Sequence, residues 1–199
     1  MLTFDHFAVS ADTLAQGVAH VERQIGVAPP PGGTHPRMGT HNHLCGLSNG
    51  EYLEVIAIDP DAPDPGRPRW FNLDRRDGPA GIGNWIVRTD DLDAAVARYP
   101  GAGVPVALTR GSLRWRMAVP EDGKLPFDGC FPAIIQWDSP PPVFPDIGLS
   151  VTRLTVSHPD ADLGDILADM IDDPRIVHTI GPTGIRADLD TPDGPRSLA

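Results

Sequence analysis

The sequence contains one pattern of elements twice, and this internal repeat constrains the fold more than any local signal does. The first copy begins with the strand-like stretch 4–9, and the second begins with the similar stretch 82–87. Each copy continues into a helix-like segment and ends in an apolar strand, at 52–56 in the first copy and at 133–137 in the second. A duplicated pattern predicts two modules of the same architecture within one chain.

Hydrophobic spacing predicts the order β-α-β-β-β within each copy. In the first copy, a strand over 2–9 precedes a helix that Ser10 or Asp12 is expected to cap. The apolar residues of this helix recur at helical spacing, as Leu14, Val18, Val21 and Ile25. The pair Asn49-Gly50 predicts a tight turn before the last strand. The second copy repeats this order, with strands predicted near 82–88, 104–109, 112–119 and 131–137.

Segments rich in proline and glycine divide the chain into its predicted modules. Residues 1–60 form the first βαβββ module and residues 82–138 form the second, with a proline-rich linker at 61–81. A third, compact βαβββ-like module is predicted for 150–199, after the prolines at 140–145. The expected fold class is therefore α+β, with tandem βαβββ modules followed by a smaller third module.

The composition is that of a folded, acidic protein. Hydrophobic residues make up 40% of the 199 residues, and the formal net charge is −11. Binding to nucleic acid requires clustered Lys and Arg, which this charge balance disfavours. The chain shows no signal-peptide pattern and no apolar run that is long enough to cross a membrane. Two cysteines, Cys45 and Cys130, do not make a disulfide scaffold, so we expect a cytoplasmic protein with reduced thiols.

Several stretches of the sequence resemble one known group of proteins. They are Met38-Gly39-Thr40-His41-Asn42, Tyr52 to Pro60, Arg67-Pro68-Arg69-Trp70-Phe71 and Leu113-Arg114-Trp115-Arg116. Together with the tandem βαβββ pattern, they resemble the glyoxalase-like domain branch of the vicinal oxygen chelate superfamily. This resemblance implies that the curved mixed sheets of two modules form a cleft. It also implies that the first and last strands of each module hold one divalent metal there.

The resemblance implies four site residues, two from each copy. Overlaying the copies places Asn84 on His6 and Gln136 on Glu54, so the second copy has neutral amides where the first has ionisable groups. His6 and Glu54 are the candidate ligands for Zn²⁺, Ni²⁺, Mn²⁺ or Fe²⁺, and the two amides are candidate substrate contacts. Catalytic metal sites usually have three protein ligands. Two interpretations are therefore open: a metal held by His6 and Glu54, or a metal-free cleft in which these two side chains hydrogen-bond each other.

Two histidines on one predicted strand extend the candidate site. His41 and His43 are two residues apart and share a face of the strand. If that face lines the cleft, they would supply a metal ligand, a general base or a substrate hydrogen bond. His41, which lies in a family-like stretch, joins Glu54 as a candidate catalytic residue, and His43 is a candidate substrate-binding residue. The alternative places one histidine at an exposed strand edge and the other at a loop.

Two clusters combine arginine with tryptophan. Trp70 lies beside Arg67 and Arg69, and Arg114 and Arg116 flank a second tryptophan. An arginine can clamp a carboxylate or phosphate, and a tryptophan can form an apolar wall. Trp70, Arg114 and Arg116 are therefore candidate substrate contacts. The alternative is cation–π packing and charge balance in an acidic protein.

These residues and the resemblance suggest two functions. One is a divalent-metal-dependent lyase or isomerase that acts on a small oxygenated metabolite, with the metal stabilising an oxyanion. The other is a metal-free protein of the same fold that binds or sequesters a small molecule. The third module either packs on the first two or pairs with another chain to form a homodimer.

Overall fold

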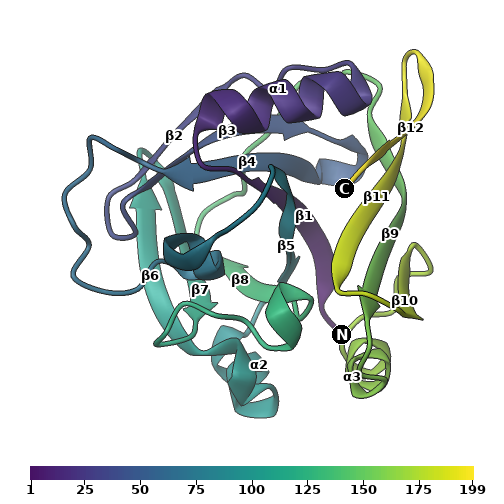
Figure 1. Cartoon of the computed structure of the whole chain (residues 1–199). Helices are drawn as coiled ribbons and strands as arrows, with labels where there is room; N and C mark the ends of the chain where they lie inside the picture. Colours follow the sequence, from purple (N-terminus) through teal and green to yellow (C-terminus); the bar gives the residue numbers. More distant parts are fainter.

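The computed structural model describes residues 1–199 and contains twelve strands and three α-helices, arranged around two sheets (Figure 1). The larger sheet has eight strands and the smaller sheet has four. The expected α+β fold class is confirmed. No helix combines the length and the apolar character that crossing a membrane requires.

The eight-stranded sheet contains both copies of the repeat. The first copy consists of β1 (Thr3–Ser10), α1 (Leu14–Ile25), β2 (Pro31–His35), β3 (Thr40–Gly46) and β4 (Tyr52–Ile58). The second copy consists of β5 (Gly81–Arg88), α2 (Leu92–Arg98), β6 (Val104–Arg110), β7 (Leu113–Val119) and β8 (Ala133–Trp137). In each copy the first strand runs parallel to the last. Strands β1 and β5 pair antiparallel at the centre, which gives the order β2-β3-β4-β1-β5-β8-β7-β6.

The eight-stranded sheet curls until its two outer strands approach each other (Figure 1). Arg37, which follows β2, donates from Nη1 to the carbonyl oxygen of Ala107 in β6 over 2.8 Å. Arg110, the last residue of β6, donates to the side chain of Asn42 in β3 over 3.1 Å. The sheet therefore forms a nearly closed barrel in which side chains of both copies face one another.

Helix α1 is capped by neither of the two residues that the sequence suggested, Ser10 and Asp12. The hydroxyl of Thr13 accepts a hydrogen bond from the first turn of the helix, so Thr13 is the N-cap. Ser10 is still part of β1, and the carboxylate of Asp12 pairs with Arg76. Gly26 ends the helix with a φ of 76°, a left-handed conformation that glycine adopts without strain.

The linker between the two copies enters the barrel. Residues 70–75 form a 3₁₀ turn in which Trp70, Phe71 and Leu73 are buried. Phe71 and Asn72 have φ values of 58° and 54°, a left-handed conformation that non-glycine residues rarely adopt. The linker thus supplies part of the interior wall.

The third unit has the same order of elements but a different sheet. It consists of β9 (Ser150–His158), α3 (Asp162–Met170), β10 (Ile176–Ile180), β11 (Gly184–Thr191) and β12 (Gly194–Leu198). Its strand order is β10-β9-β11-β12, so its first strand pairs parallel with β10 and antiparallel with β11. In the two barrel copies the first strand instead pairs parallel with the last. The third unit is therefore not a third copy of the same sheet.

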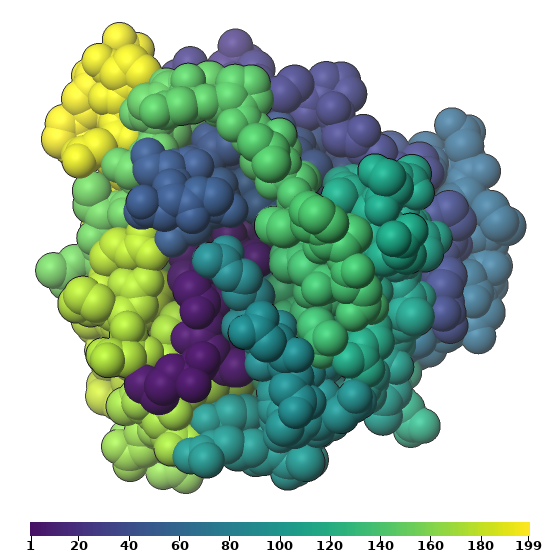
Figure 2. All heavy atoms as spheres, turned by 180° about the vertical axis from the view of Figure 1, so that it is seen from behind, coloured from purple at the N-terminus to yellow at the C-terminus, as the bar shows by residue number.

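The third unit packs on the first copy. Arg175 donates to the buried carboxylate of Glu51 over 2.6 Å. The segment between β8 and β9 crosses the back of the molecule (Figure 2), and its Phe144 lies 5.3 Å from the ring of Tyr52. A single hydrophobic core includes residues of all three units.

Candidate functional site

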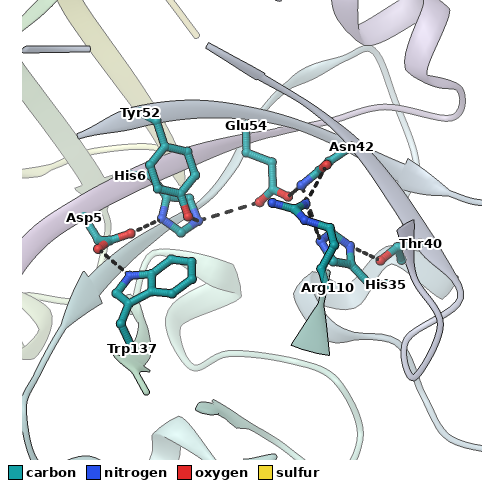
Figure 3. Close-up of polar contacts among 9 residues, drawn as sticks. All are labelled: Asp5, His6, His35, Thr40, Asn42, Tyr52, Glu54, Arg110 and Trp137. Atoms are coloured by element: carbon teal, nitrogen blue, oxygen red, sulfur yellow. Dashed lines mark hydrogen bonds and ion pairs between the residues drawn. The ribbon is translucent and has the colours of Figure 1, made fainter. Parts of the chain in front are cut away.

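At an irregularity in β1, the side chains of the sequence neighbours Asp5 and His6 contact each other. The pairing of β1 with β5 shifts register between Phe4 and His6, so Asp5 has no direct partner on β5. Such irregularities often re-aim side chains near functional sites. Asp5 Oδ1 lies 2.6 Å from His6 Nδ1, and Trp137 Nε1 donates to Asp5 Oδ2 over 3.2 Å (Figure 3). Asp5 therefore holds the imidazole of His6 in one orientation.

The second ring nitrogen of His6 faces β4. Glu54 Oε2 lies 3.7 Å from His6 Nε2, and the Tyr52 hydroxyl lies 3.4 Å from the same nitrogen. The rings of Tyr52 and His6 are stacked, with centroids 4.1 Å apart. All three side chains are buried. The structure thus brings together His6 and Glu54, the two candidate metal ligands, on the interior face of the barrel (Figure 3).

The other oxygen of Glu54 is held by Asn42. Asn42 Nδ2 donates to Glu54 Oε1 over 2.6 Å. Asn42 Oδ1 accepts from the backbone nitrogen of Gly33 over 2.9 Å and from Arg110 Nη1 over 3.1 Å. Asn42 therefore connects the carboxylate to a guanidinium that comes from the opposite edge of the sheet.

His35 lies beside Asn42 and Arg110 as a neutral imidazole. Its Nε2 is 3.4 Å from Asn42 Nδ2 and 3.4 Å from Arg110 Nη1, and both of these atoms are donors. Nε2 must therefore be the unprotonated acceptor, and Nδ1 donates to Thr40 Oγ1 over 3.0 Å.

Burial and neighbouring charges set the protonation of these groups. Burial alone would lower the pKa of His6, but Asp5 and Glu54 outweigh it and raise the pKa above the ordinary value. Burial alone would raise the pKa of Asp5 and of Glu54, but hydrogen bonds and charge from His6 lower both. Burial lowers the pKa of His35 to about 4. The site therefore favours an imidazolium between two carboxylates, with a neutral imidazole nearby.

These polar groups border a small cavity with an aromatic wall. Its volume is about 30 Å³. The apolar side chains that line it are Leu44, Trp70, Phe71, Trp115, Met117, Ile135 and Trp137. A water molecule needs at least about 10–15 Å³, so the cavity has room for one or two. An apolar wall strengthens the electrostatic interactions of the polar groups inside it.

The donor set of this cavity does not fit a divalent metal. His6 and Glu54 supply one imidazole and one carboxylate that face each other, and no group of three or more His, Cys, Asp or Glu side chains is arranged so that it could hold a metal ion. Burial raises the pKa of Tyr52 well above its ordinary range, so this neighbour stays a neutral phenol. The Asp5–His6 pair resembles the carboxylate–histidine pairs that orient metal ligands, but the further ligands are missing.

Asn84 corresponds to His6 but lies outside the cluster. Phe7 pairs directly with Trp85, His6 pairs with Ile86, and Ala8 pairs with Asn84. If a twofold axis through the Phe7–Trp85 pair relates the two copies, it superposes His6 on Asn84. This agrees with the overlay of the two sequence copies. Asn84 is buried but does not line the cavity that His6 borders.

Gln136 does not correspond to Glu54, which corrects the overlay of the last strands. The same twofold axis superposes Ala8 on Ile86. On the neighbouring strands, Ala8 pairs with Glu54 and Ile86 pairs with Ala133. Ala133 is therefore the counterpart of Glu54. Gln136 lies outside the cavity, where its Oε1 accepts a hydrogen bond from the backbone nitrogen at the start of α2 over 2.8 Å.

His41 and His43 lie on the outer face of β3. Asn42 lines the cavity, so its two neighbours point to the other side of the strand. His41 Nδ1 is 3.9 Å from Asp59 Oδ1, and His43 Nδ1 donates to the carbonyl oxygen of Pro29 over 2.6 Å. The face that these histidines share is not the face that lines the cavity.

The two Arg/Trp clusters divide between the cavity and the surface. Trp70 and Trp115 both line the cavity. Arg114 and Arg116 take the opposite face of β7 from Trp115, and Arg116 Nη1 pairs with Asp93 of α2 over 2.9 Å. The tryptophans therefore form the wall, while these two arginines lie outside it.

The sequence did not indicate Asp5, which holds His6, or three polar residues that line the cavity: His35, Asn42 and Arg110. Asp5 is adjacent to His6, and Asn42 is adjacent to His41 and His43. Strand alternation and the irregularity in β1 decide which of these adjacent side chains points to the site. His35 sits in a segment rich in proline and glycine, which indicated a loop. Arg110 carries no local signal, because its contact with Asn42 spans 68 residues of chain.

Comparison with known proteins agrees with this architecture. A family model described as a glyoxalase-like domain matches residues 4–167. A hypothetical protein from Staphylococcus aureus has 16% sequence identity and a TM-score of 0.58, covering 97% of this chain and 83% of that chain. At this identity the likeness shows the fold alone. No curated protein matches the chain significantly.

Two methylmalonyl-CoA epimerases are also similar in structure. The Streptomyces coelicolor enzyme, a variant in complex with 2-nitronate-propionyl-CoA, has 18% identity and a TM-score of 0.45, covering 70% of this chain and 100% of that chain. The Mycobacterium tuberculosis enzyme has 17% identity and a TM-score of 0.43, covering 68% of this chain and 86% of that chain.

Proposed function

This chain belongs to the glyoxalase-like domain family, and on that premise we propose that it is an acid–base enzyme of lyase or isomerase type. Its substrate would be a small oxygenated metabolite, and the reaction would need no metal. The observation that carries the proposal is the orientation of His6. Asp5 binds one of its ring nitrogens, and the other faces Glu54 across 3.7 Å, beside a cavity with an aromatic wall.

The proposed step converts the substrate to its enol by removing one proton from carbon and adding another to oxygen. Glu54 takes the proton from a carbon next to a carbonyl group, and the electron pair of that C–H bond becomes the carbon–carbon double bond of an enol. The carbonyl oxygen takes the proton from His6 Nε2. Once His6 is neutral, the charge that lowers the pKa of Glu54 is gone. Glu54 therefore becomes a stronger base as the oxyanion is neutralised, while Asp5 acts as a positioning residue.

The walls of the cavity limit the substrate. A cavity of about 30 Å³ admits a molecule of a few heavy atoms only if the aromatic wall gives way. Arg110 forms hydrogen bonds with the neutral side chains of Asn42 and His35, so its guanidinium can still pair with a carboxylate of the substrate. We therefore propose short 2-oxo or 2-hydroxy carbonyl compounds as the substrate class.

Exchange of carbon-bound hydrogen with solvent deuterium tests this proposal. Hydroxyacetone, pyruvate and methylglyoxal would be incubated with the protein in D₂O and followed by proton NMR. We expect faster exchange of at least one probe, and a loss of about 100-fold or more in Glu54→Gln. Gln136→Ala is the matched control, because Gln136 lies outside the cavity. Equal exchange by wild type and Glu54→Gln would rule out Glu54 as the base.

A second candidate function is binding without catalysis. The observation that favours it is the lowered pKa of Glu54, because a weaker base is less suited to proton abstraction. In the same NMR experiment, saturable shifts of a probe without exchange would support this function. Exchange that appears only after addition of Zn²⁺, Ni²⁺, Mn²⁺ or Fe²⁺ would instead favour a metal-dependent reaction.

A further inference from the structure

A second and much larger cavity lies on the other side of the linker turn. Its volume is about 460 Å³, which is within the range of about 300–1,000 Å³ that is typical of ligand pockets. It is formed by the end of β1, the start of β5, the linker and the loop between β7 and β8. Phe71 is the only residue that lines both cavities. The linker turn thus separates two compartments.

Unpartnered polar atoms gather around this second cavity. The chain has six buried side-chain polar atoms without a hydrogen-bond partner, and three of them belong to residues that line it. These three are Ser10 Oγ, Asn72 Oδ1 and Asn84 Oδ1. Ser10 is 6% exposed and Asn84 is 2% exposed, so bulk water reaches them poorly. Burying a polar atom without a partner is costly, so these three atoms are available to hydrogen-bond a molecule in the cavity.

Two cations at the mouth of the cavity lack carboxylate partners. Arg75 and Lys124 are exposed and line the opening. Arg75 Nη1 donates to the backbone carbonyl of Asp122 over 3.2 Å, which leaves its charge uncompensated. Lys124 is the only lysine in a chain whose net charge is −11.

The remaining charges at this cavity nearly cancel. Arg76 also lines it, but pairs with the carboxylate of Asp12. Asp77 and Asp128 line it as anions, and Asp128 is 3.8 Å from the imidazole of His158. With Asp12 counted, three cations face three anions, so the cavity carries no net charge, and Arg75 and Lys124 are the two cations left without a carboxylate partner.

We propose that this cavity binds a small anionic polyol, such as a sugar phosphate or a sugar acid. Its hydroxyl groups would donate to the side-chain oxygens of Asn72 and Asn84 and exchange hydrogen bonds with Ser10. Its phosphate or carboxylate would lie at the mouth, between Arg75 and Lys124. This site is distinct from the His6 cavity, and the proposal does not depend on the acid–base function.

The single lysine allows a direct test. The protein would be acetylated with a limiting amine-reactive ester, with and without glucose 6-phosphate, and modification would be measured by peptide mass spectrometry. At a ligand concentration ten times the dissociation constant, we expect modification of Lys124 to slow by about tenfold, because about one site in ten is free. The α-amine of Met1, which does not line the cavity, should react at an unchanged rate.

Four probes separate the parts of the proposed ligand. Glucose 6-phosphate and gluconate should protect Lys124, while glucose and inorganic phosphate should each protect it much less. Equal protection by inorganic phosphate would overturn the polyol assignment. Absence of protection by every probe, or equal protection of Lys124 and Met1, would overturn the site itself.

Calorimetric titration of glucose 6-phosphate into variants provides a second readout. Asn84→Asp places a negative charge among the unpartnered atoms, and we expect a loss of affinity of about tenfold or more. Arg75→Gln and Lys124→Gln change only exposed residues, so they test the site even if Asn84→Asp does not fold. Arg153→Gln, which lies in β9 outside the cavity, is the matched control. Unchanged affinity in both surface variants would overturn the proposal.

Discussion

Across the Phe7–Trp85 pair, the first copy of the repeat places His6 where the second places Asn84, and Glu54 where the second places Ala133. The strands pair in the same way in both copies, so the backbone at these positions is equivalent. The first copy contributes buried ionisable groups to the interior. The second contributes mainly apolar residues of β7 and β8 to the wall that faces them.

This difference shows how a duplicated fold can carry a one-sided site. Packing around the centre of the sheet depends on Phe7 and Trp85, which are both fully buried. The neighbouring interior positions are free to differ, provided that every buried charge has a partner. Here Asp5, His6 and Glu54 lie within a single copy and carry one more negative than positive charge. The second copy supplies the apolar wall together with two cations, since Arg88 lies 3.5 Å from Asp5 and Arg110 lines the cavity.

The largest expected loss of stability comes from Phe7 and Trp85, the equivalent positions at which both copies have a buried aromatic residue. Phe7→Ala and Trp85→Ala should each lower the free energy of unfolding by about 3–5 kcal/mol, because each leaves a cavity at the centre of the sheet. Trp85→Ala also removes the hydrogen bond from Trp85 Nε1 to the carbonyl oxygen of Cys130, which is 2.8 Å long. Chemical denaturation measures both. A loss below about 1 kcal/mol in either variant would show that the copies are not equivalent at their centre.

A second variant removes the charge that distinguishes the first copy. In Asp5→Asn, burial should dominate and lower the pKa of His6, because its closest anion is gone. We expect a loss of about 2–3 kcal/mol in the free energy of unfolding. NMR titration of the His6 ring protons measures the pKa, and denaturation measures the stability. Asp93→Asn, at an exposed ion pair, is the control, and an unchanged pKa of His6 would contradict the assigned role of Asp5.

The pH dependence of stability should separate two histidines of the same cavity. The pKa of His35 is lowered from 6.5 to about 4, so the unfolded chain binds this proton at a higher pH than the folded chain does. Its contribution is therefore complete above pH 6.5 and is lost as the pH falls towards 4, by about 3 kcal/mol. The raised pKa of His6 has the opposite sign, and its contribution is lost as the pH rises through the folded pKa.

Denaturation of wild type and His35→Gln between pH 7 and pH 4 checks this expectation. The difference in unfolding free energy between the two proteins should shrink as the pH falls. A constant difference would mean that His35 has the same pKa in the folded and unfolded states, contrary to the effect of its burial.

The smallest effect is expected at Gln136, which the sequence overlay matched with Glu54. Gln136→Ala should cost about 1 kcal/mol, because the backbone nitrogen of Leu92 at the start of α2 loses its acceptor. The pKa of His6 should not change. Glu54→Gln should lower that pKa, since it removes an anion from the cavity. If Gln136→Ala shifted the titration of His6 as much as Glu54→Gln does, the register of β8 would be wrong.

Much of the fold could be predicted because its signals are local. The stripe from Leu14 to Ile25 indicated α1, and the repeated order of elements indicated the tandem modules. The residues of the site were harder to predict, because they depend on the register in which the strands pair. The apolar run that ends at Trp137 looks like the run around Glu54, but the pairing of β5 with β8 puts Ala133 at the equivalent position. A shift by an odd number of residues also moves a side chain to the other face of the sheet.

The sequence by itself determined the order of elements, the duplication and the presence of His6 and Glu54 on strands of one module, because periodicity and turn chemistry act over a few residues. Only the tertiary structure decided which side chains meet. Strand alternation turned Asn42 inward and His41 outward, and the curling of the sheet carried Arg110 to Asn42. The linker turn placed Phe71 between the small interior cavity and the larger, more exposed one. These contacts join residues that are distant in the chain, so no local pattern encodes them.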